Sequence, residues 1–277
     1  MLQEFDLPAR WTSLIQDYFS EAVHNLAQMW PDDQSLDISY RTIEGFDTEF
    51  AHDIVQNPDL HFHAANQALR QFLIDAGSPT MFPFVRINHL PSDQVRTVSQ
   101  LRADDIGQML ALDSVVTKIS GVRPRIYSAQ FECMACNHTM IINQPNEQEL
   151  IEPVECEQIT GGCGRAKRQT RFALNHKESI LINSQFIELQ ELPEQMKGGI
   201  QPERILCIGE HDLAGKLNPG DRVKANGVLF IRSQRKGGKD TPVFDIFLRI
   251  QSLERQNVPL EEISITEDEE LEIKELA

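Results

Sequence analysis

The sequence predicts an α+β protein of more than one domain, in which an N-terminal helical bundle precedes a β-rich region. Three observations lead to this prediction. Apolar residues recur at helical spacing over residues 1–85 and alternate, as in strands, from about Ile106 onward. Four of the five cysteines lie in one insertion between the expected strands. A Gly-Gly pair with basic neighbours joins two long alternating runs near the end of the β-rich region.

The helical region is defined by the positions of its apolar residues. From Arg10 to Trp30 they follow the three-and-four spacing of one buried helix face, and Pro31 ends that helix. A short strand and two further helices are expected at Leu36–Tyr40, Phe46–Val55 and Leu60–Leu73, before a break at Gly77–Pro79. Residues 1–85 are therefore expected to form a mostly helical bundle.

The β-rich region consists of short alternating runs separated by turn residues. Strands are expected at Leu110–Ile119, Arg125–Phe131, Met140–Asn143, Arg171–Leu174, Ile180–Glu191, Arg204–Glu210, Arg222–Ile231 and Val243–Leu253. Many short strands of this kind are typical of a barrel or a sandwich. The residues from about Asn257 onward are acidic with few apolar positions, which is typical of a solvated linker.

The net charge of −16 hides an uneven distribution. Residues 1–60 hold 12 acidic and 2 basic side chains and residues 254–277 hold 9 and 2, which leaves the middle of the chain close to neutral. A uniformly acidic chain does not favour binding to phosphates, which depends on clustered Lys and Arg. This chain, however, has two basic clusters without acids, which favour phosphate binding locally. The first comprises Arg165, Lys167, Arg168 and Arg171, and the second comprises Arg232, Arg235, Lys236 and Lys239.

The chain has no sequence feature of a membrane or secreted protein. Its apolar runs are far shorter than the roughly 18 residues that a membrane span needs. The amino terminus, Met1–Asp6, lacks the basic start and apolar core of a signal peptide. We therefore expect a reducing cytoplasm, no membrane partner and no disulfide bonds.

The four clustered cysteines have the spacing of a zinc site. Two residues separate Cys133 from Cys136, so two thiolates around a tight turn occupy two corners of a tetrahedron. After a 19-residue gap, six residues separate Cys156 from Cys163, and glycines next to Cys163 supply the backbone angles that such a turn needs. The spacing predicts a closed four-thiolate site that holds Zn²⁺ for structure and leaves no position for catalysis.

Other roles for these residues remain open. The cysteines could form a redox pair or serve as reduced structural thiols. His138 could replace one thiolate as a ligand. Cys207 lies in an apolar run and is interpreted as a small buried residue outside the site.

The run from Phe230 to Phe244 predicts a long β-hairpin with a basic tip, because apolar residues alternate on both sides of Gly237-Gly238. Its candidate contacts to DNA phosphates are Arg232, Arg235, Lys236 and Lys239. The alternative is a tip that serves only solubility.

A second set of candidate DNA contacts lies near the start of the β-rich region and after the cysteines, and comprises Lys118, Arg123, Arg125 and Arg171. Such residues can line a groove that follows the backbone of a single strand. Tyr127 and Phe131 are the only aromatic residues close by, so backbone contact is expected rather than base readout. The alternative is ordinary exposed charge. The long connection Leu192–Glu203 is either functional or a tolerated insertion.

The sequence contains no motif of a nucleotide-hydrolysing site. Gly237-Gly238-Lys239 is followed by Asp240 and is not preceded by the spaced glycine of a phosphate-binding loop. The zinc-protease pattern H-E-x-x-H and the zinc-deaminase pattern are also missing. We therefore expect no catalytic residues in this chain.

Three segments resemble the minichromosome maintenance (MCM) family of replicative DNA helicases, in particular its archaeal type. The first extends from Val115 to Cys136 and begins Val-Val-Thr-Lys-Ile-Ser-Gly-Val-Arg-Pro-Arg. The second, Ile182–Glu194, reads Ile-Asn-Ser-Gln-Phe-Ile-Glu-Leu-Gln-Glu-Leu-Pro-Glu and is followed by Gly198-Gly199 and Pro202-Glu203-Arg204. The third, Leu217–Val223, reads Leu-Asn-Pro-Gly-Asp-Arg-Val. Together they cover most of residues 84–255 in order.

This resemblance implies the N-terminal region of such a helicase. The implied segments are a helical subdomain at 1–85, an OB-fold barrel at 86–132 and 165–255, a zinc-binding insertion at 133–164, and an acidic linker at 256–277. The implied partners are single- and double-stranded DNA, further copies in a homohexamer or double hexamer, and a C-terminal ATPase domain of the same protein. ATP and Mg²⁺ would act only in that motor, and the location would be the cytoplasm, at the nucleoid.

The resemblance also implies roles for particular residues. The hairpin cations would contact DNA in the ring channel, the second set would contact a single strand, and Leu192–Glu203 would communicate with the ATPase. Two departures stand out: Ser114 replaces the usual Gly, and six residues separate Cys156 from Cys163 instead of a shorter gap. Two other functions remain, a stand-alone zinc and OB-fold binder of single-stranded nucleic acid and a purely structural assembly domain.

Overall fold

The computed structural model describes residues 6–77, 81–144, 149–192, 194, 201–236 and 239–256, without the side chains of 234–236 and 239–240. The chain divides into two compact units. The first comprises residues 1–119, 187–208 and 216–277, and the second comprises residues 120–186 and 209–215. The expected acidic linker lies outside the described residues. No helix within the described ranges is long and apolar enough to span a membrane.

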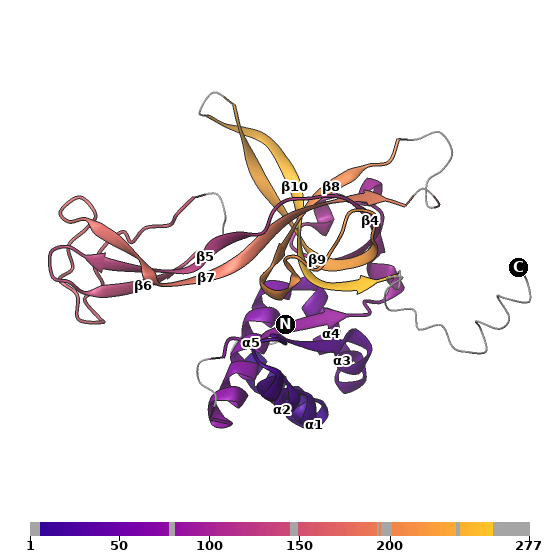
Figure 1. The fold of residues 1–277 in the computed structure, drawn as a ribbon, viewed down its shortest axis with the longest axis horizontal. Coiled ribbons are helices and arrows are strands. Elements are labelled where there is room, and N and C mark those ends of the chain that lie inside the picture. Colours follow the sequence, from indigo (N-terminus) through magenta and orange to yellow (C-terminus); the bar gives the residue numbers. More distant parts are fainter. Residues whose placement is uncertain are drawn as a thin grey trace, which may run out of the picture. The chain divides into compact units, whose positions relative to one another are not determined.

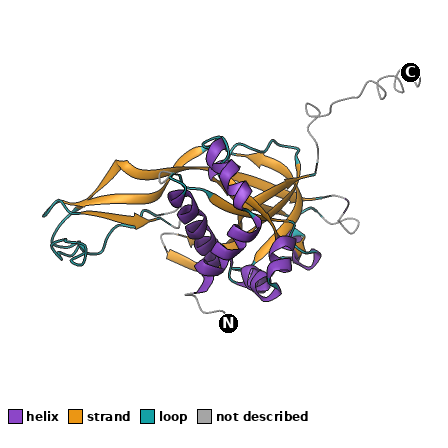
Figure 2. Ribbon diagram, turned by 90° about the horizontal axis from the view of Figure 1, so that it is seen from below, coloured by secondary structure: helices purple, strands orange, loops and turns teal. Residues whose placement is uncertain are grey.

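The N-terminal region of the first unit is helical, as expected (Figure 2). Its helices are α1 (Leu7–Tyr18), α2 (Ser20–Met29), α3 (Tyr40–Phe46), α4 (Thr48–Gln56) and α5 (Pro58–Asp75). The expected helices at 46–55 and 60–73 correspond to α4 and α5, whereas α3 was not expected. Asp47 caps α4, because its carboxylate accepts a hydrogen bond from the backbone N–H of Phe50 at 3.0 Å.

The prediction of one helix from Arg10 to Trp30 is wrong, because the chain breaks at Phe19. Phe19 has a φ of −129°, outside the helical range. The next residue, Ser20, donates its hydroxyl to the carbonyl of Gln16 at 2.5 Å, and bonds of this kind bend helices. The apolar spacing continues across the break, so the pattern gives no sign of it.

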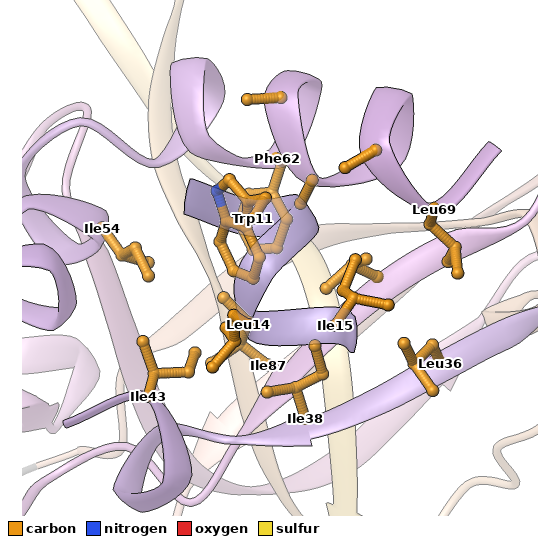
Figure 3. Packing of buried hydrophobic residues seen from close by; sticks show 14 of the residues in the cluster. Trp11, Leu14, Ile15, Leu36, Ile38, Ile43, Ile54, Phe62, Leu69 and Ile87 are labelled. Carbon is orange, nitrogen blue, oxygen red and sulfur yellow. The ribbon is translucent and has the colours of Figure 1, made fainter. Parts of the chain in front are cut away.

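The helices share one hydrophobic core (Figure 3). At its centre the ring of Trp11 meets that of Phe50 edge to face, with centroids 5.2 Å apart, and Phe50 meets His61 in the same way at 5.0 Å. The same cluster includes Met109 and Val228 from the strands of this unit. Burial of this continuous apolar surface stabilises the helical region and attaches it to the barrel.

A two-stranded parallel sheet completes the helical region. The strands are β1 (Ser35–Ser39), which the sequence predicts, and β2 (Phe84–Asn88), which follows α5. In this register Leu36 lies opposite Val85 and Ile38 lies opposite Ile87. The region is therefore a helical bundle with a small sheet and not a bundle alone.

The remaining strands form an eight-stranded sheet in the order β3-β4-β9-β10-β8-β7-β5-β6, with an additional pairing between β4 and β7. The strands are β3 (Val95–Arg96), β4 (Met109–Ile119), β5 (Arg123–Cys133), β6 (Thr139–Asn143), β7 (Phe172–Glu191), β8 (Arg204–Glu210), β9 (Arg222–Lys236) and β10 (Lys239–Arg255). Because β4 pairs with both β9 and β7, strands β4, β9, β10, β8 and β7 close on themselves. This is the five-stranded barrel of the OB fold.

Two strands of the first unit extend as a long hairpin (Figure 1). In β9 and β10, Phe230 lies opposite Phe247 and Lys236 lies opposite Lys239. Gly227 is required where the strands cross the barrel, since a Cβ there would lie 2.4 Å from the carbonyl oxygen of Arg249. The predicted hairpin is confirmed in its strands, and its Gly237-Gly238 turn lies outside the described residues.

The second unit is built on β5, β6 and the first part of β7, which pair antiparallel. The two runs expected at 171–174 and 180–191 belong to the single strand β7. Between them the register shifts, and the hydroxyl of Ser179 donates to the carbonyl of Asn175 at 2.6 Å. The charged residues of this irregular stretch interrupt the alternation, which is why the sequence suggests two strands.

Candidate metal centre and nucleic-acid interface

The first cysteine pair lies on a tight turn at the end of β5. The backbone N–H groups of Cys136 and Asn137 both donate to the carbonyl of Cys133, at 3.3 and 2.7 Å. Asn137 has a φ of +58°, a left-handed conformation that Asn tolerates better than most residues. The N–H of Cys133 then donates to the carbonyl of His138 at 2.9 Å and closes the turn. Both thiols therefore face the same side of the turn.

The second pair forms a similar turn despite its six-residue spacing. The N–H of Cys163 donates to the Sγ atom of Cys156 at 3.4 Å, and the N–H of Gly164 donates to the carbonyl of Cys156 at 3.1 Å. A Cβ at Gly162 would lie 2.5 Å from the same Sγ atom, so only glycine fits there. The longer spacing is thus absorbed by a glycine-rich loop that returns Cys163 to Cys156.

All four predicted ligands meet at one point, with their Sγ atoms within 4.8 Å of one another. The Sγ atoms of Cys133 and Cys163 are 3.8 Å apart, and those of Cys136 and Cys156 are 3.7 Å apart. Sulfurs that lie about 2.3 Å from a zinc ion at the corners of a tetrahedron are roughly 3.8 Å apart. The cysteines are free thiols in this arrangement, which is consistent with a structural zinc site.

The surrounding groups support this assignment. Burial raises the pKa of the Cys133 thiol, but hydrogen bonds from the backbone of Ala135 and the hydroxyl of Thr170 outweigh it and lower the pKa to about 6. Burial raises the pKa of the neighbouring Cys156 thiol to about 12, so a metal ion that binds all four sulfurs would have to displace this proton. The Nε2 atom of His138 is 2.9 Å from the hydroxyl of Thr160, so this ring has a partner outside the cluster. Cys207 is fully buried, and burial raises the pKa of its thiol, as expected for an inert residue.

The cysteine module carries a basic groove. Four exposed cations line it together with Met134, Ala135, Gln169 and Thr170, and they are Arg165, Lys167, Arg168 and Arg171. Its volume is about 610 Å³. The backbone of Arg165 accepts a hydrogen bond from the N–H of Cys156 at 2.9 Å, and that of Arg171 accepts one from Met134 at 3.0 Å. The same turns that position the cysteines therefore also position the cations.

The cations of β5 differ from each other. Arg123 is exposed at the start of the strand. Arg125 is mostly buried, with its Nη2 atom 2.5 Å from a carboxylate oxygen of Glu210 and its Nη1 atom 2.8 Å from the carbonyl of Gln144. Arg123 can therefore reach a phosphate freely, whereas Arg125 already has a carboxylate partner.

Lys118 lies at the end of β4 in the first unit. Its Nζ atom is 3.6 Å from Glu188, although its side chain is 70% exposed. Arg204 contacts the other carboxylate oxygen of Glu188 at 3.1 Å. Burial opposes the charge of Glu188, but a hydrogen bond from Thr117 and these two cations outweigh it and lower the pKa of the carboxyl group. Lys118 is accessible, but part of its charge is compensated.

Of the hairpin cations, Arg232 is the one whose side chain is described. Its guanidinium carbon lies 4.1 Å from the centre of the Phe247 ring, so it forms a cation–π contact near the base of the hairpin. Arg235, Lys236 and Lys239 lie farther out on the strands, and their side chains are outside the described part of the structure. Most of the expected functional loop, Leu192–Glu203, also lies outside the described residues.

Sequence reasoning missed the acidic partners of the basic residues. Glu188 and Glu210 lie far from Lys118 and Arg125 in the sequence and become neighbours only through strand pairing. Sequence reasoning also treated the two nearby aromatic residues alike, whereas Phe131 is 1% exposed and Tyr127 is 43% exposed. A register shift in β5 that no sequence pattern reveals accounts for the exposure of Tyr127.

Comparisons with known proteins agree with this geometry. The family model for the MCM OB domain matches residues 97–233, which include the four cysteines. The minichromosome maintenance protein MCM of Saccharolobus solfataricus is 29% identical over 252 residues, which are 88% of this chain and 36% of that protein. The DNA replication licensing factor MCM4 of Drosophila melanogaster is 22% identical over 82% of this chain and 25% of its own length.

A solved structure extends the likeness beyond the barrel. The crystal structure of the N-terminal domain of an archaeal MCM superposes with a TM-score of 0.78 and 27% identity, and covers 92% of this chain and 100% of that one. The chain thus spans about a third of the length of its archaeal relative. The chain belongs to the MCM family and corresponds to the N-terminal domain of its members.

Proposed function

We propose that this chain is the DNA-binding and ring-forming N-terminal region of a replicative MCM helicase. It binds single-stranded and double-stranded DNA in the channel of a homohexamer, through its basic hairpin, residues of the OB region and the basic groove beside the four cysteines. Zn²⁺ held by the four cysteines stabilises the module around it. ATP hydrolysis and unwinding are assigned to an ATPase domain in another part of the protein.

The observation that carries the DNA-binding proposal is the basic groove beside the four cysteines. Four exposed cations line it in a chain whose net charge is −16, and such local concentration of positive charge is what phosphate binding requires. One of them, Lys167, pairs with Glu152 at 2.8 Å, so Arg165, Arg168 and Arg171 contribute most of this charge. The cations favour backbone contacts over base contacts, because Lys and Arg at exposed positions neutralise phosphates of any sequence. We therefore propose binding with little sequence preference.

The structural partners rank the individual DNA contacts. Arg123 and Arg171 are exposed and are the strongest candidates in the second set. Lys118 is a weaker candidate because Glu188 competes for it, and Arg125 is the weakest because Glu210 and Gln144 already bind its guanidinium. Arg125 instead holds its strand in position through these two contacts. Arg235, Lys236 and Lys239 remain candidates through their positions near the hairpin turn.

Ring formation rests mainly on family membership. One feature of the cysteine module agrees with assembly into a double hexamer. Val154 and Ile159 are 79% and 102% exposed, although both are apolar. Exposed apolar residues in one small module favour a contact with another protein surface.

Light scattering on the eluting peaks of a size-exclusion column tests the proposal. With and without a single-stranded oligonucleotide, and over a salt series, we expect a hexamer or double hexamer whose DNA affinity falls steeply with salt. A monomer that binds DNA equally well would instead identify a stand-alone zinc and OB-fold binder. A ring that ignores DNA would identify a purely structural assembly domain.

A further inference from the structure

We propose that Tyr127 is a stacking platform for a nucleobase of single-stranded DNA. This inference rests on the proposed DNA-binding function and adds a contact to the bases, where the basic residues supply contacts to the backbone. A stacking contact tolerates any base, because every base has a π-face. The platform would therefore distinguish single strands, whose bases are accessible, from duplexes, whose bases are stacked on each other.

Tyr127 owes its exposure to a β-bulge. Along β5 and β7, Ile126 lies opposite Leu181 and Ser128 lies opposite Ile180, so Tyr127 is the extra residue between two consecutive pairs. Bulges change the direction of a side chain and are frequent next to functional sites. Tyr127 is 43% exposed.

The bulged backbone is held firmly. The carbonyl of Tyr127 accepts a hydrogen bond from the N–H of Gln144 at 2.8 Å, and the carbonyl of Gln144 accepts one from Arg125 at 2.8 Å. The side chain of Gln144 is itself hydrogen-bonded to both backbone groups of Ile151. The ring of Tyr127 thus projects from a braced segment, which lowers the entropy lost when a base stacks on it.

A neighbouring histidine sets the orientation of the ring. The centroids of Tyr127 and His211 are 5.7 Å apart and their planes are inclined by 69°, an edge-to-face contact. His211 has a φ of +58° and begins the 3₁₀ turn His211–Leu213, which the buried Leu213 anchors. This contact supports the tyrosine from one side and leaves much of its surface open.

The platform shares one strand face with two arginines. Arg125 contacts Glu210 and Tyr127 contacts His211, so two consecutive residues of one loop pack against this face. Arg123 precedes Arg125 by two residues and therefore points to the same side. Arg123 and Tyr127 are about 13 Å apart along an extended strand. An extended single strand of a few nucleotides can place a phosphate on Arg123 and a base on Tyr127.

The test compares two ligands of equal length and charge, a thymidine oligonucleotide and an oligomer of abasic deoxyribose phosphates. We expect wild-type protein to bind the thymidine strand at least about fivefold more tightly. Tyr127→Ala should lose this preference and keep its affinity for the abasic strand and its salt dependence. Tyr127→Phe should retain the preference because it keeps the ring. Tyr18→Ala, at another exposed tyrosine, should behave as wild type.

Arg123→Ala provides the opposite control. It should lower the affinity for both ligands equally and reduce the slope of log affinity against log salt concentration by about 0.7. Equal wild-type affinity for the two ligands, or an equal loss on both in Tyr127→Ala, would overturn the stacking proposal and leave phosphate binding intact. Absence of binding to either ligand would overturn the proposed function and the stacking proposal together.

Tyr127→Trp reports base stacking directly through its fluorescence, without removal of the aromatic ring. The fluorescence it adds to that of Trp11 and Trp30 should be quenched by the thymidine strand and not by the abasic strand. Quenching by both strands, or by neither at saturating ligand, would contradict stacking at this position.

Discussion

The helical region and the cysteine module are held together by different forces. The helical region buries a continuous cluster that includes Trp11, Phe50 and Ile87, so the hydrophobic effect stabilises it. In the described part of the cysteine module the buried cluster comprises Cys133, Met140 and Cys156, with Phe172 packed against it. So small a core does not offset the entropy of folding, and a bound metal is expected to supply most of the stability.

This difference shows how a small module can be stable while most of its residues lie at the surface, where they can make contacts. Four thiols that meet at one point, as in a structural zinc site, would take the place of the many apolar residues of an ordinary core. The other residues of the module are then available at the surface, where Arg168 and Arg171 line the basic groove. The helical region uses its apolar residues for packing, and its surface is mainly acidic.

Loss of the metal should have the largest effect on stability, and this effect should be confined to the cysteine module. Cys133→Ser removes a ligand, and structural zinc contributes about 10 kcal/mol or more to the folding of small zinc domains. We expect elemental analysis to find about one zinc per chain in wild type and none in the variant. Hydrogen exchange should show lost protection in residues 133–172 and retained protection in α1 and α5.

Cys207→Ala is the matched control for this experiment, because Cys207 is a buried thiol outside the cluster. It should keep the zinc. The account also predicts that Cys133→Ser no longer assembles into rings. A folded, metal-free hexamer would contradict the role of the metal.

Trp11→Ala should have the next largest effect, on the other region. Trp11 is fully buried at the centre of the helical core, and truncation of a buried Trp costs about 3–5 kcal/mol. Chemical denaturation should show this loss, whereas the zinc content should stay unchanged. Tyr18→Ala, at an exposed position of the same helix, should be close to neutral. Zinc loss in Trp11→Ala would show that the two regions do not fold independently.

Asp47→Ala should have a smaller effect of about 1–2 kcal/mol, because it removes the N-cap of α4. It also removes the carboxylate partner of Arg10, a mostly buried pair, so the measured loss combines the cap and the ion pair. Thermal unfolding measures the change. Asp17→Ala, at an exposed position near the end of α1, is the control and should not lower the melting temperature.

The smallest effect should be a pH dependence of the helical region. Burial lowers the pKa of His61, although Asp53 opposes this shift. The unfolded chain therefore binds a proton more readily than the folded chain, so stability is greatest above the unfolded pKa of about 6.5 and declines as the pH falls toward the folded value. The fluorescence of Trp11 and Trp30 can follow this unfolding. The stability of His61→Phe should depend less on pH than that of wild type. An unchanged dependence of stability on pH would contradict the role of His61.

Local patterns made part of this structure predictable. Spacing alone identified the four cysteines as one site, because two short turns are sufficient to bring two pairs of thiols together. The alternation around Gly237-Gly238 identified the hairpin, and apolar periodicity identified the buried face of α1 and α5. In each case the information lies within a few neighbouring residues.

Other features depend on contacts between distant segments and were not predictable. The pairing of Arg125 with Glu210 and of Lys118 with Glu188 arises only when strands distant in the sequence meet. The exposure of Tyr127 follows from a register shift between β5 and β7. The apolar spacing continues through the break at Phe19, where the hydroxyl of the next residue, Ser20, donates to the carbonyl of Gln16.

The central claim is that this acidic chain binds DNA through local basic clusters. The most direct test is the dissociation constant for a single-stranded oligonucleotide over a salt series, for wild type, Arg235→Ala/Lys236→Ala and the control Arg41→Ala, which changes an exposed arginine of α3. The account predicts a steep loss of affinity with salt in wild type and control, and a slope smaller by about 0.7 per lost phosphate contact in the double variant. A wild-type affinity that does not depend on salt, or an unchanged slope in the double variant, would contradict it.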